Sequence, residues 1–169
     1  MKARPWWLMS SLVVAFSVAC GGAATPVNTE ADVAAINAVR EREMGFVNSG
    51  NPDSLSAVYA SDVIMMPPNE PAVNGRDAVR QWAQTAFGQV TMSVRYTNTQ
   101  VTVAGDWAVD RYTGVLTVTP KAGGAPMEEQ IKGVHVMRRE ADGSWSIAQD
   151  VWNSDAAPPP PAPAVPAKK

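Results

Sequence analysis

A predicted β-hairpin brings one histidine and one aspartate together so that they could share a proton. The dipeptide Asp142–Gly143 lies between two β-like segments, which is a strong signal for a two-residue hairpin turn. Such a turn pairs Ala141 with Ser144 and, further along the ladder, His135 with Asp150. Directly opposed side chains of antiparallel strands lie about 5 Å apart. The carboxylate would raise the pKa of the histidine, giving a charge pair or an acid/base pair near neutral pH.

The face of the sheet that carries this pair is left open by the sequence. The same register pairs Met137 with Ala148 and Gly133 with Trp152. The other face of the hairpin is the more apolar one, with Val134, Val136, Trp145, Ile147 and Val151. By periodicity alone, the pair is either a solvated ion pair on an outer face or an acid/base pair inside a cavity.

Other reactive side chains are scarce, and this excludes several classes of site. His135 is the only histidine and Cys20 the only cysteine, so neither an intrachain disulfide nor a structural zinc site with four nitrogen or sulfur ligands can form. No Gly-x-Ser-x-Gly motif occurs, and we expect no cofactor. Residues 21–155 hold ten Lys and Arg against sixteen Asp and Glu, a net charge of −6 that disfavours a nucleic-acid partner.

Residues 1–20 have the pattern of an export signal. Two basic residues precede the uncharged segment Pro5–Ala19, whose 15 residues fall short of the ~20 that a membrane-spanning helix needs. Ser17–Gly21 resembles the lipobox of bacterial lipoprotein precursors, although Ser17 stands where leucine is usual, and an ordinary signal peptidase could also cleave here. We expect Cys20 to carry a lipid that holds the exported protein on the periplasmic or extracytoplasmic side of the cell envelope.

The chain then divides into a tether, one domain and a tail. Residues 21–28 are rich in Gly and Ala and predict a flexible tether. Residues 156–169 are rich in Pro and Ala and predict a disordered tail in polyproline II conformations. The remaining residues, 29–155, suffice for one domain with its own core.

The first half of this domain predicts three helices. The first runs over about 29–49 and stops at Gly50, the second starts at Pro52 and includes Tyr59, and the third follows Gly75. A short strand over 62–66 and a loop over 69–74 separate the last two. The apolar positions at helical spacing are Val33, Ile36, Val39, Val47, Leu55, Val58, Tyr59, Val79, Trp82 and Phe87.

The second half alternates with period two and predicts four strands, over 90–103, 107–119, 127–140 and 145–152. The parity of the first of these strands changes along its length, which a β-bulge between Thr97 and Gln100 would explain. Three helices followed by a long-stranded antiparallel sheet predict an α+β fold.

Three stretches, Asn48–Asp62, Met66–Arg76 and Asp142–Ser154, resemble the nuclear transport factor 2-like superfamily, which includes ketosteroid isomerases and SnoaL-like polyketide cyclases. The resemblance covers about residues 29–155. It implies a cone in which a strongly curved sheet and three helices enclose a pocket, commonly in a homodimer.

The resemblance also implies roles for individual residues. It places His135 where the isomerases carry a protonated aspartate, and Asp150 and Trp152 in the pocket wall. It places Met66 or Pro67 where the isomerases carry their general base, so the proton-transfer step of steroid isomerisation is lost.

The sequence suggests further residues for the pocket, each of which also has a simpler structural interpretation. Asp110 and Tyr112 share parity on one strand and could line the cavity, or lie at a solvent-facing edge. Tyr59 and Met66 could also line it, or fill the core. The resemblance places Glu43 where the isomerases carry their oxyanion-binding tyrosine. With Arg40 and Arg42 nearby, we expect this carboxylate to be solvated unless it points inward.

Three functions remain open at this point. The first is a cell-envelope lipoprotein whose pocket binds a small, partly apolar ligand. The second is an enzyme of cyclase, isomerase or lyase type with Asp150 as base and His135 as acid or orienting group. The third is a homodimeric protein-interaction module with a vestigial pocket.

Overall fold

A computed structural model of the protein describes residues 29–155, and the predictions for residues 1–28 and 156–169 lie outside this part. The elements follow in the order α1 (Thr29–Ser49), α2 (Pro52–Ala57), β1 (Tyr59–Met66), β2 (Val73–Asn74), α3 (Arg76–Gln89), β3 (Val90–Ala104), β4 (Trp107–Pro120), β5 (Met127–Arg139) and β6 (Trp145–Ser154). Within residues 29–155 no helix is both long enough and apolar enough to span a membrane.

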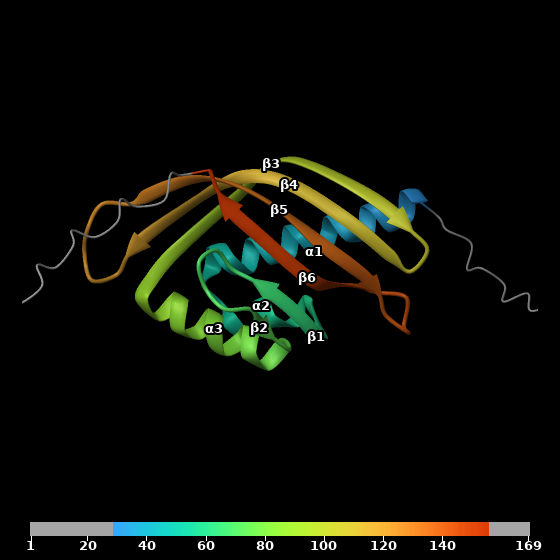
Figure 1. The fold of residues 1–169 in the computed structure, drawn as a ribbon, viewed down its shortest axis with the longest axis horizontal. Helices are drawn as coiled ribbons and strands as arrows, with labels where there is room; N and C mark the ends of the chain where they lie inside the picture. Colours follow the sequence, from blue (N-terminus) through green and yellow to red (C-terminus); the bar gives the residue numbers. More distant parts are fainter. Residues whose placement is uncertain (1–28, 156–169) are drawn as a thin grey trace, which may run out of the picture.

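The predicted α+β cone is confirmed. The sheet has the strand order β2-β1-β6-β5-β4-β3, in which β1 and β6 are parallel and all other neighbours are antiparallel. In Figure 1 the long strands β3, β4 and β5 arch over α1, while α2 and α3 lie beside β1 and β2 below the arch. The concave face of the sheet and the three helices therefore enclose the interior.

The helix boundaries follow from local signals that the sequence displays. Gly50 has a φ of +63°, a conformation that favours glycine, and ends α1. The Asn51 side chain accepts a hydrogen bond from the Ser54 backbone amide at 2.9 Å and caps α2. Two expectations were wrong. Tyr59 begins strand β1 instead of ending the second helix, and Val73–Asn74 pairs with β1 as a short strand where a loop was predicted.

The register between β5 and β6 contains two irregularities that cancel. The hairpin loop has three residues, since the Glu140 amide bonds to the Ser144 carbonyl, so Ala141 does not face Ser144 as predicted. A bulge at Ala148 then restores the expected pairing, and His135 lies opposite Asp150. The bulge predicted in the strand over 90–103 is confirmed as a register shift at Thr97 in β3.

The bulge at Ala148 also resolves the conflict between the two faces of the hairpin. Met137 pairs with Ile147 instead of with Ala148, which places Ile147 on the same face as Asp150. Both residues are buried, and Ile147 belongs to the main hydrophobic core. The concave face is therefore apolar near the hairpin and polar further along β6.

Candidate functional site

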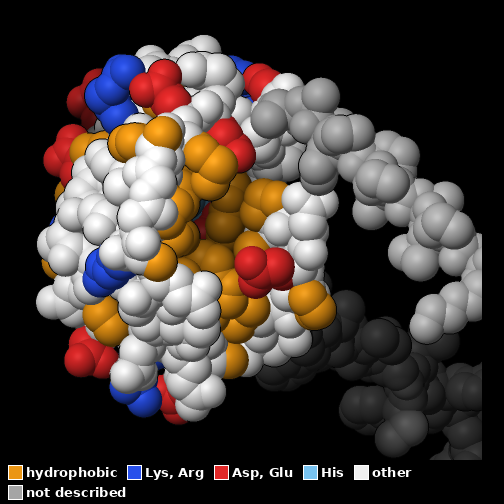
Figure 2. Space-filling view, turned by 90° about the vertical axis from the view of Figure 1, so that its left-hand side faces the viewer, with side chains coloured by type: hydrophobic (Ala, Val, Ile, Leu, Met, Phe, Trp, Pro, Cys, Tyr) orange, Lys and Arg blue, Asp and Glu red, His pale blue; other side chains and the backbone are white. Residues whose placement is uncertain are grey.

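An apolar cavity of about 70 Å³ lies between the concave face of the sheet and helices α1 and α3. A second chamber of about 160 Å³ adjoins it, and the two share Trp82, Met92, Leu116, Ile131 and Trp152. Figure 2 shows the resulting hollow, with hydrophobic side chains over most of its wall. The cavity is lined by Glu43, Val47, Leu55, Tyr59, Met65, Trp82, Phe87, Met92, Val94, Tyr96, Tyr112, Leu116, Ile131, Asp150 and Trp152.

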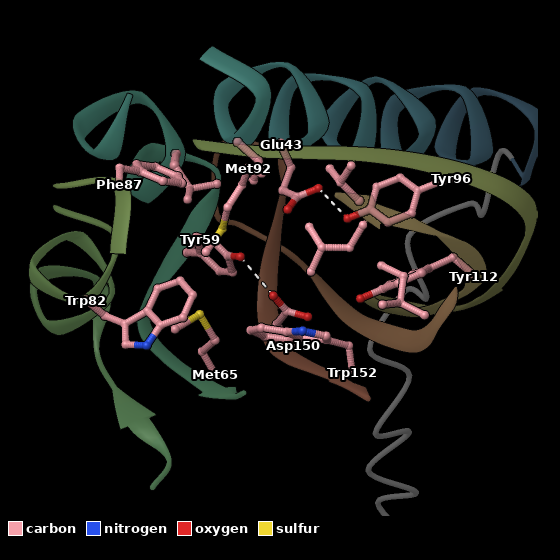
Figure 3. A pocket seen from close by; sticks show the side chains of 15 residues that line it. Glu43, Tyr59, Met65, Trp82, Phe87, Met92, Tyr96, Tyr112, Asp150 and Trp152 are labelled. Atoms are coloured by element: carbon pink, nitrogen blue, oxygen red, sulfur yellow. Dashed lines mark hydrogen bonds between the residues drawn. The ribbon is translucent and has the colours of Figure 1, made fainter. Parts of the chain in front are cut away.

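Asp150 on β6 is a polar group of this wall that keeps free hydrogen-bonding capacity. Its Oδ2 accepts a hydrogen bond from the Tyr59 hydroxyl at 2.8 Å (Figure 3). Its Oδ1 is buried and has no hydrogen-bond partner. Burial raises the pKa of Asp150 above its ordinary value, and nearby His135 only partly opposes this. Asp150, which lines the cavity, can therefore hold or accept a proton.

His135 on β5 lies behind Asp150, between two carboxylates. Its Nε2 is 3.5 Å from Asp150 Oδ1, and its Nδ1 is 3.5 Å from Asp110 Oδ2. Burial alone would lower the pKa of His135, but the carboxylates of Asp150, Asp110 and Glu43 raise it above its ordinary value. The predicted pair thus faces inward, with the imidazole in contact with the ring of Tyr112 at 4.7 Å between centroids.

An ion pair lies next to His135, on the side away from Asp150. The Arg40 guanidinium on α1 donates to Asp110 Oδ1 at 2.7 Å, and both side chains are buried. The pair fixes Asp110, whose other oxygen faces His135. Arg40 and Asp110 are therefore positioning residues for the imidazole.

Glu43 is the functional candidate for which the expectation of a solvated side chain was wrong. It is buried and lines the cavity from α1, where its Oε2 accepts a hydrogen bond from the Tyr96 hydroxyl at 2.7 Å. Burial first, and then the charge of Asp150, raises its pKa from 4.5 to about 7, although His135 opposes the shift. The signal was helical spacing, because Glu43 lies midway between Val39 and Val47 on the buried stripe.

The other predicted pocket residues divide into two groups. Tyr59, Tyr112 and Trp152 line the cavity as expected. Met66 does not, because it pairs with Val151 on the outer face of the sheet, and alternation along β1 puts Met65 into the wall instead.

Asp110 is buried but does not line the cavity. It pairs with His135 across β4 and β5 and lies behind the wall.

The arrangement offers acid/base chemistry or hydrogen bonding in a low-dielectric site. Two carboxyl groups with raised pKa values, Glu43 and Asp150, point into the cavity from opposite walls (Figure 3). Among the residues that the structure describes, no three His, Cys, Asp or Glu side chains gather as metal ligands would.

Comparisons with solved structures identify proteins of similar fold. A ketosteroid isomerase-like protein from Erwinia carotovora atroseptica matches with a TM-score of 0.67 and 26% identity, over 78% of this chain and 100% of that chain. An NTF2-like superfamily protein from Salmonella enterica matches with a TM-score of 0.70 and 13% identity, over 76% of this chain and 94% of that chain. A candidate dehydratase of the NTF2-like family from Streptomyces avermitilis matches with a TM-score of 0.68 and 18% identity, over 76% of this chain and 99% of that chain.

Sequence comparison identifies the family. A search of curated proteins found no match to the chain. The family model of the SnoaL-like domain, however, matches residues 41–147, a range that includes Glu43, Tyr59, Tyr112 and His135. The chain therefore belongs to the SnoaL-like domain family.

Proposed function

We propose that the domain binds a small, partly apolar ligand in the cavity between the sheet and the helices. The observation that carries this proposal is Asp150 Oδ1, a buried oxygen without a hydrogen-bond partner on a residue of a mainly apolar wall. A buried polar atom of this kind is costly unless something bonds to it. A ligand with an apolar body and one polar group would satisfy this oxygen and fill the aromatic wall around it.

Fluorine NMR of the protein labelled with 5-fluorotryptophan tests this proposal. Trp82 and Trp152 line both chambers, whereas Trp107 is exposed and pairs with Arg138 on the other face of the sheet. Small aromatic and alicyclic compounds should shift the Trp82 and Trp152 resonances and leave that of Trp107 unchanged. Compounds that shift only Trp107, or a fragment set that shifts none of the three, would refute the proposal.

A second candidate function is catalysis, with Asp150 as the base and His135 as the group that orients it. It is favoured by the 3.5 Å approach of His135 Nε2 to the unpartnered Asp150 Oδ1. Exchange of the α-protons of small cyclic enones in D₂O, followed by NMR, would detect such a base. Asp150→Asn should reduce the exchange rate at least ~100-fold, since general base catalysis contributes that much. An unchanged rate in Asp150→Asn would dismiss the mechanism.

For the whole chain we propose a lipoprotein of the cell envelope, anchored through Cys20. The support is the sequence of residues 1–20, an export pattern whose only cysteine follows the apolar stretch directly. Labelling of cells with radioactive palmitate should mark the protein, and Cys20→Ala should release it from the membrane fraction. An unlabelled exported protein that is equally soluble with and without Cys20 would contradict the anchor.

We further propose a homodimer that forms through the outer face of the sheet. This face exposes Ile64, Trp107 and Val109, and strand pairing places Val136 between Val109 and Gln149 on the same face. Sedimentation should show a dimer that Val109→Lys dissociates. A protein that is monomeric at all concentrations would exclude both this assembly and an interaction module built on it.

A further inference from the structure

The buried polar groups around the cavity contain more acids than bases. Five ionisable side chains are at most 8% exposed and belong to one cluster: Arg40, Glu43, Asp110, His135 and Asp150. Even when the imidazole is protonated, two cations face three carboxyl groups. A buried carboxylate without a counter-charge is strongly unfavourable, so the protein alone must hold an extra proton in this cluster.

The residues that line the two chambers also include acidic side chains but no basic ones. None of the lining residues, all within residues 29–155, is Lys, Arg or His. The inner cavity has Glu43 and Asp150, and the outer chamber has Glu70 and Glu129. Both chambers are therefore lined by acidic side chains without a basic one, which favours cations over anions.

Three hydrogen-bond donors in the wall are already used on these carboxylates. The Tyr59 hydroxyl donates to Asp150, the Tyr96 hydroxyl to Glu43, and the Trp82 Nε1 to Glu70. The cavity-lining residue Asp150 keeps an acceptor without a hydrogen-bond partner, Oδ1, which His135 Nε2 approaches only to 3.5 Å. An acceptor is complemented by a donor on the ligand, and a charged donor bonds about twice as strongly as a neutral one.

The rest of the wall suits the body and the charge of an organic cation. Six aromatic rings line the inner cavity: Tyr59, Trp82, Phe87, Tyr96, Tyr112 and Trp152. Aromatic faces bury apolar groups and also attract cations through their electron-rich surfaces. The edge-on packing of Trp82 against Trp152, at 6.2 Å between ring centroids, holds two of these rings at the junction of the chambers.

We propose that the ligand of this cavity is an organic amine, whose ammonium group bonds to Asp150 Oδ1 on the wall opposite Glu43 and whose apolar body lies against the aromatic wall. This inference rests on the proposed ligand-binding function and names its chemical class. The ammonium supplies the missing positive charge of the cluster, so binding replaces the proton that the carboxyl groups share. An anionic ligand would instead add a further negative charge to a buried site.

Amine binding should therefore be coupled to proton release. Glu43, with a pKa of about 7, is the group that loses the proton. The titratable and charged groups that face it from the surrounding elements are Arg40, Tyr59, Tyr96, Asp110, Tyr112, His135 and Asp150. An amine remains protonated well above neutral pH, so its affinity should rise between pH 6 and pH 8 as the carboxyl group ionises.

Matched ligand pairs test the inference by isothermal titration calorimetry on the purified protein. The probes are benzylamine against benzyl alcohol and cyclohexylmethylamine against cyclohexylmethanol, with benzoate as the anion. Each amine should bind at least ~10-fold tighter than its alcohol at pH 8, and titrations in buffers of different ionisation enthalpy should show proton release at pH 7. Asp150→Asn should lower the amine-to-alcohol affinity ratio at least ~10-fold.

The control variant is Glu128→Gln, because Glu128 is exposed and adjoins Glu129 on β5 but lies outside both chambers. It should leave the affinity ratio unchanged. Alcohols or benzoate that bind as tightly as the amines would overturn the inference while the ligand-binding function stands. If none of the five probes binds, both the inference and the proposed function fail.

Discussion

Replacing Glu43 by glutamine should remove a large part of the pH dependence of the protein's stability. Burial raises the pKa of this carboxyl group from 4.5 to about 7 in the folded protein. A group with a raised pKa stabilises the fold fully below the pKa of the unfolded chain, and this contribution is lost as the pH rises through the folded value. At about 1.4 kcal/mol per pH unit, the loss between pH 4.5 and pH 7 amounts to about 3 kcal/mol.

The sign of this effect is opposite to that of the carboxylates that pair with arginine. Arg138 lowers the pKa of Asp62, and Arg139 that of Asp32, so these groups contribute stability above their ordinary pKa of 3.8 and lose it at lower pH. Raised pKa values at His135 and Asp150 act in the same direction as that of Glu43. The wild type should therefore be most stable near pH 5, and its free energy of unfolding should fall toward pH 8.

Urea denaturation followed by tryptophan fluorescence at pH 5, 6, 7 and 8 measures the effect. Glu43→Gln keeps an acceptor for the Tyr96 hydroxyl but cannot ionise, so its free energy of unfolding should fall by about 3 kcal/mol less than that of the wild type across this range. Glu41→Gln is the matched control, because Glu41 is an exposed glutamate on the same helix. Parallel pH curves for the wild type and Glu43→Gln would refute the burial of a shifted carboxyl group.

Two further substitutions test the packing behind the cavity. Arg40→Met should destabilise the protein by about 3–5 kcal/mol in urea denaturation, because the Asp110 carboxylate is then buried without its guanidinium partner. Adding Asp110→Asn should restore most of this loss. An Arg40→Met variant as stable as the wild type would contradict the buried ion pair. Gly133→Ala should cost about 1–3 kcal/mol, because a methyl group there would lie 2.5 Å from the Tyr112 hydroxyl oxygen. Gly45→Ala is its control, since that methyl group would meet no atom within 4 Å, and equal midpoints for the two variants would contradict the position of Tyr112.

The pairing of His135 with Asp150 could be predicted from the sequence, although the assumed turn was wrong. The dipeptide Asp142–Gly143 marks a hairpin, but a two-residue and a three-residue loop carry the same residues and differ by one step of register. The bulge at Ala148 then reverses that step. No local residue type announces this bulge, because it follows from packing Ile147 into the core while Asp150 keeps facing inward.

The charge of the site was harder to predict than its fold. Apolar stripes identify helices reliably because burial is what makes them apolar, so a glutamate within a stripe is taken for a solvated residue. Glu43 breaks this rule since its carboxyl group meets the Tyr96 hydroxyl, 53 residues further along the chain. Similarly, Met65 and Met66 are alike in sequence, and only the pairing of β1 with β6 decides which one reaches the cavity.

The same carboxyl groups that would recognise a cation also limit the stability of the fold, and this connects the two properties quantitatively. A ligand at 100 times its dissociation constant stabilises a protein by about 2.7 kcal/mol, close to the ~3 kcal/mol that ionisation of Glu43 removes between pH 4.5 and pH 7. An amine bound at Asp150 should thus return at pH 8 about what deprotonation costs, and stabilise less at pH 5, where a proton already occupies the site. A neutral alcohol should give the same stabilisation at both pH values, because it exchanges no proton. The charge of the ligand, more than its shape, therefore decides how much its binding stabilises the protein at a given pH.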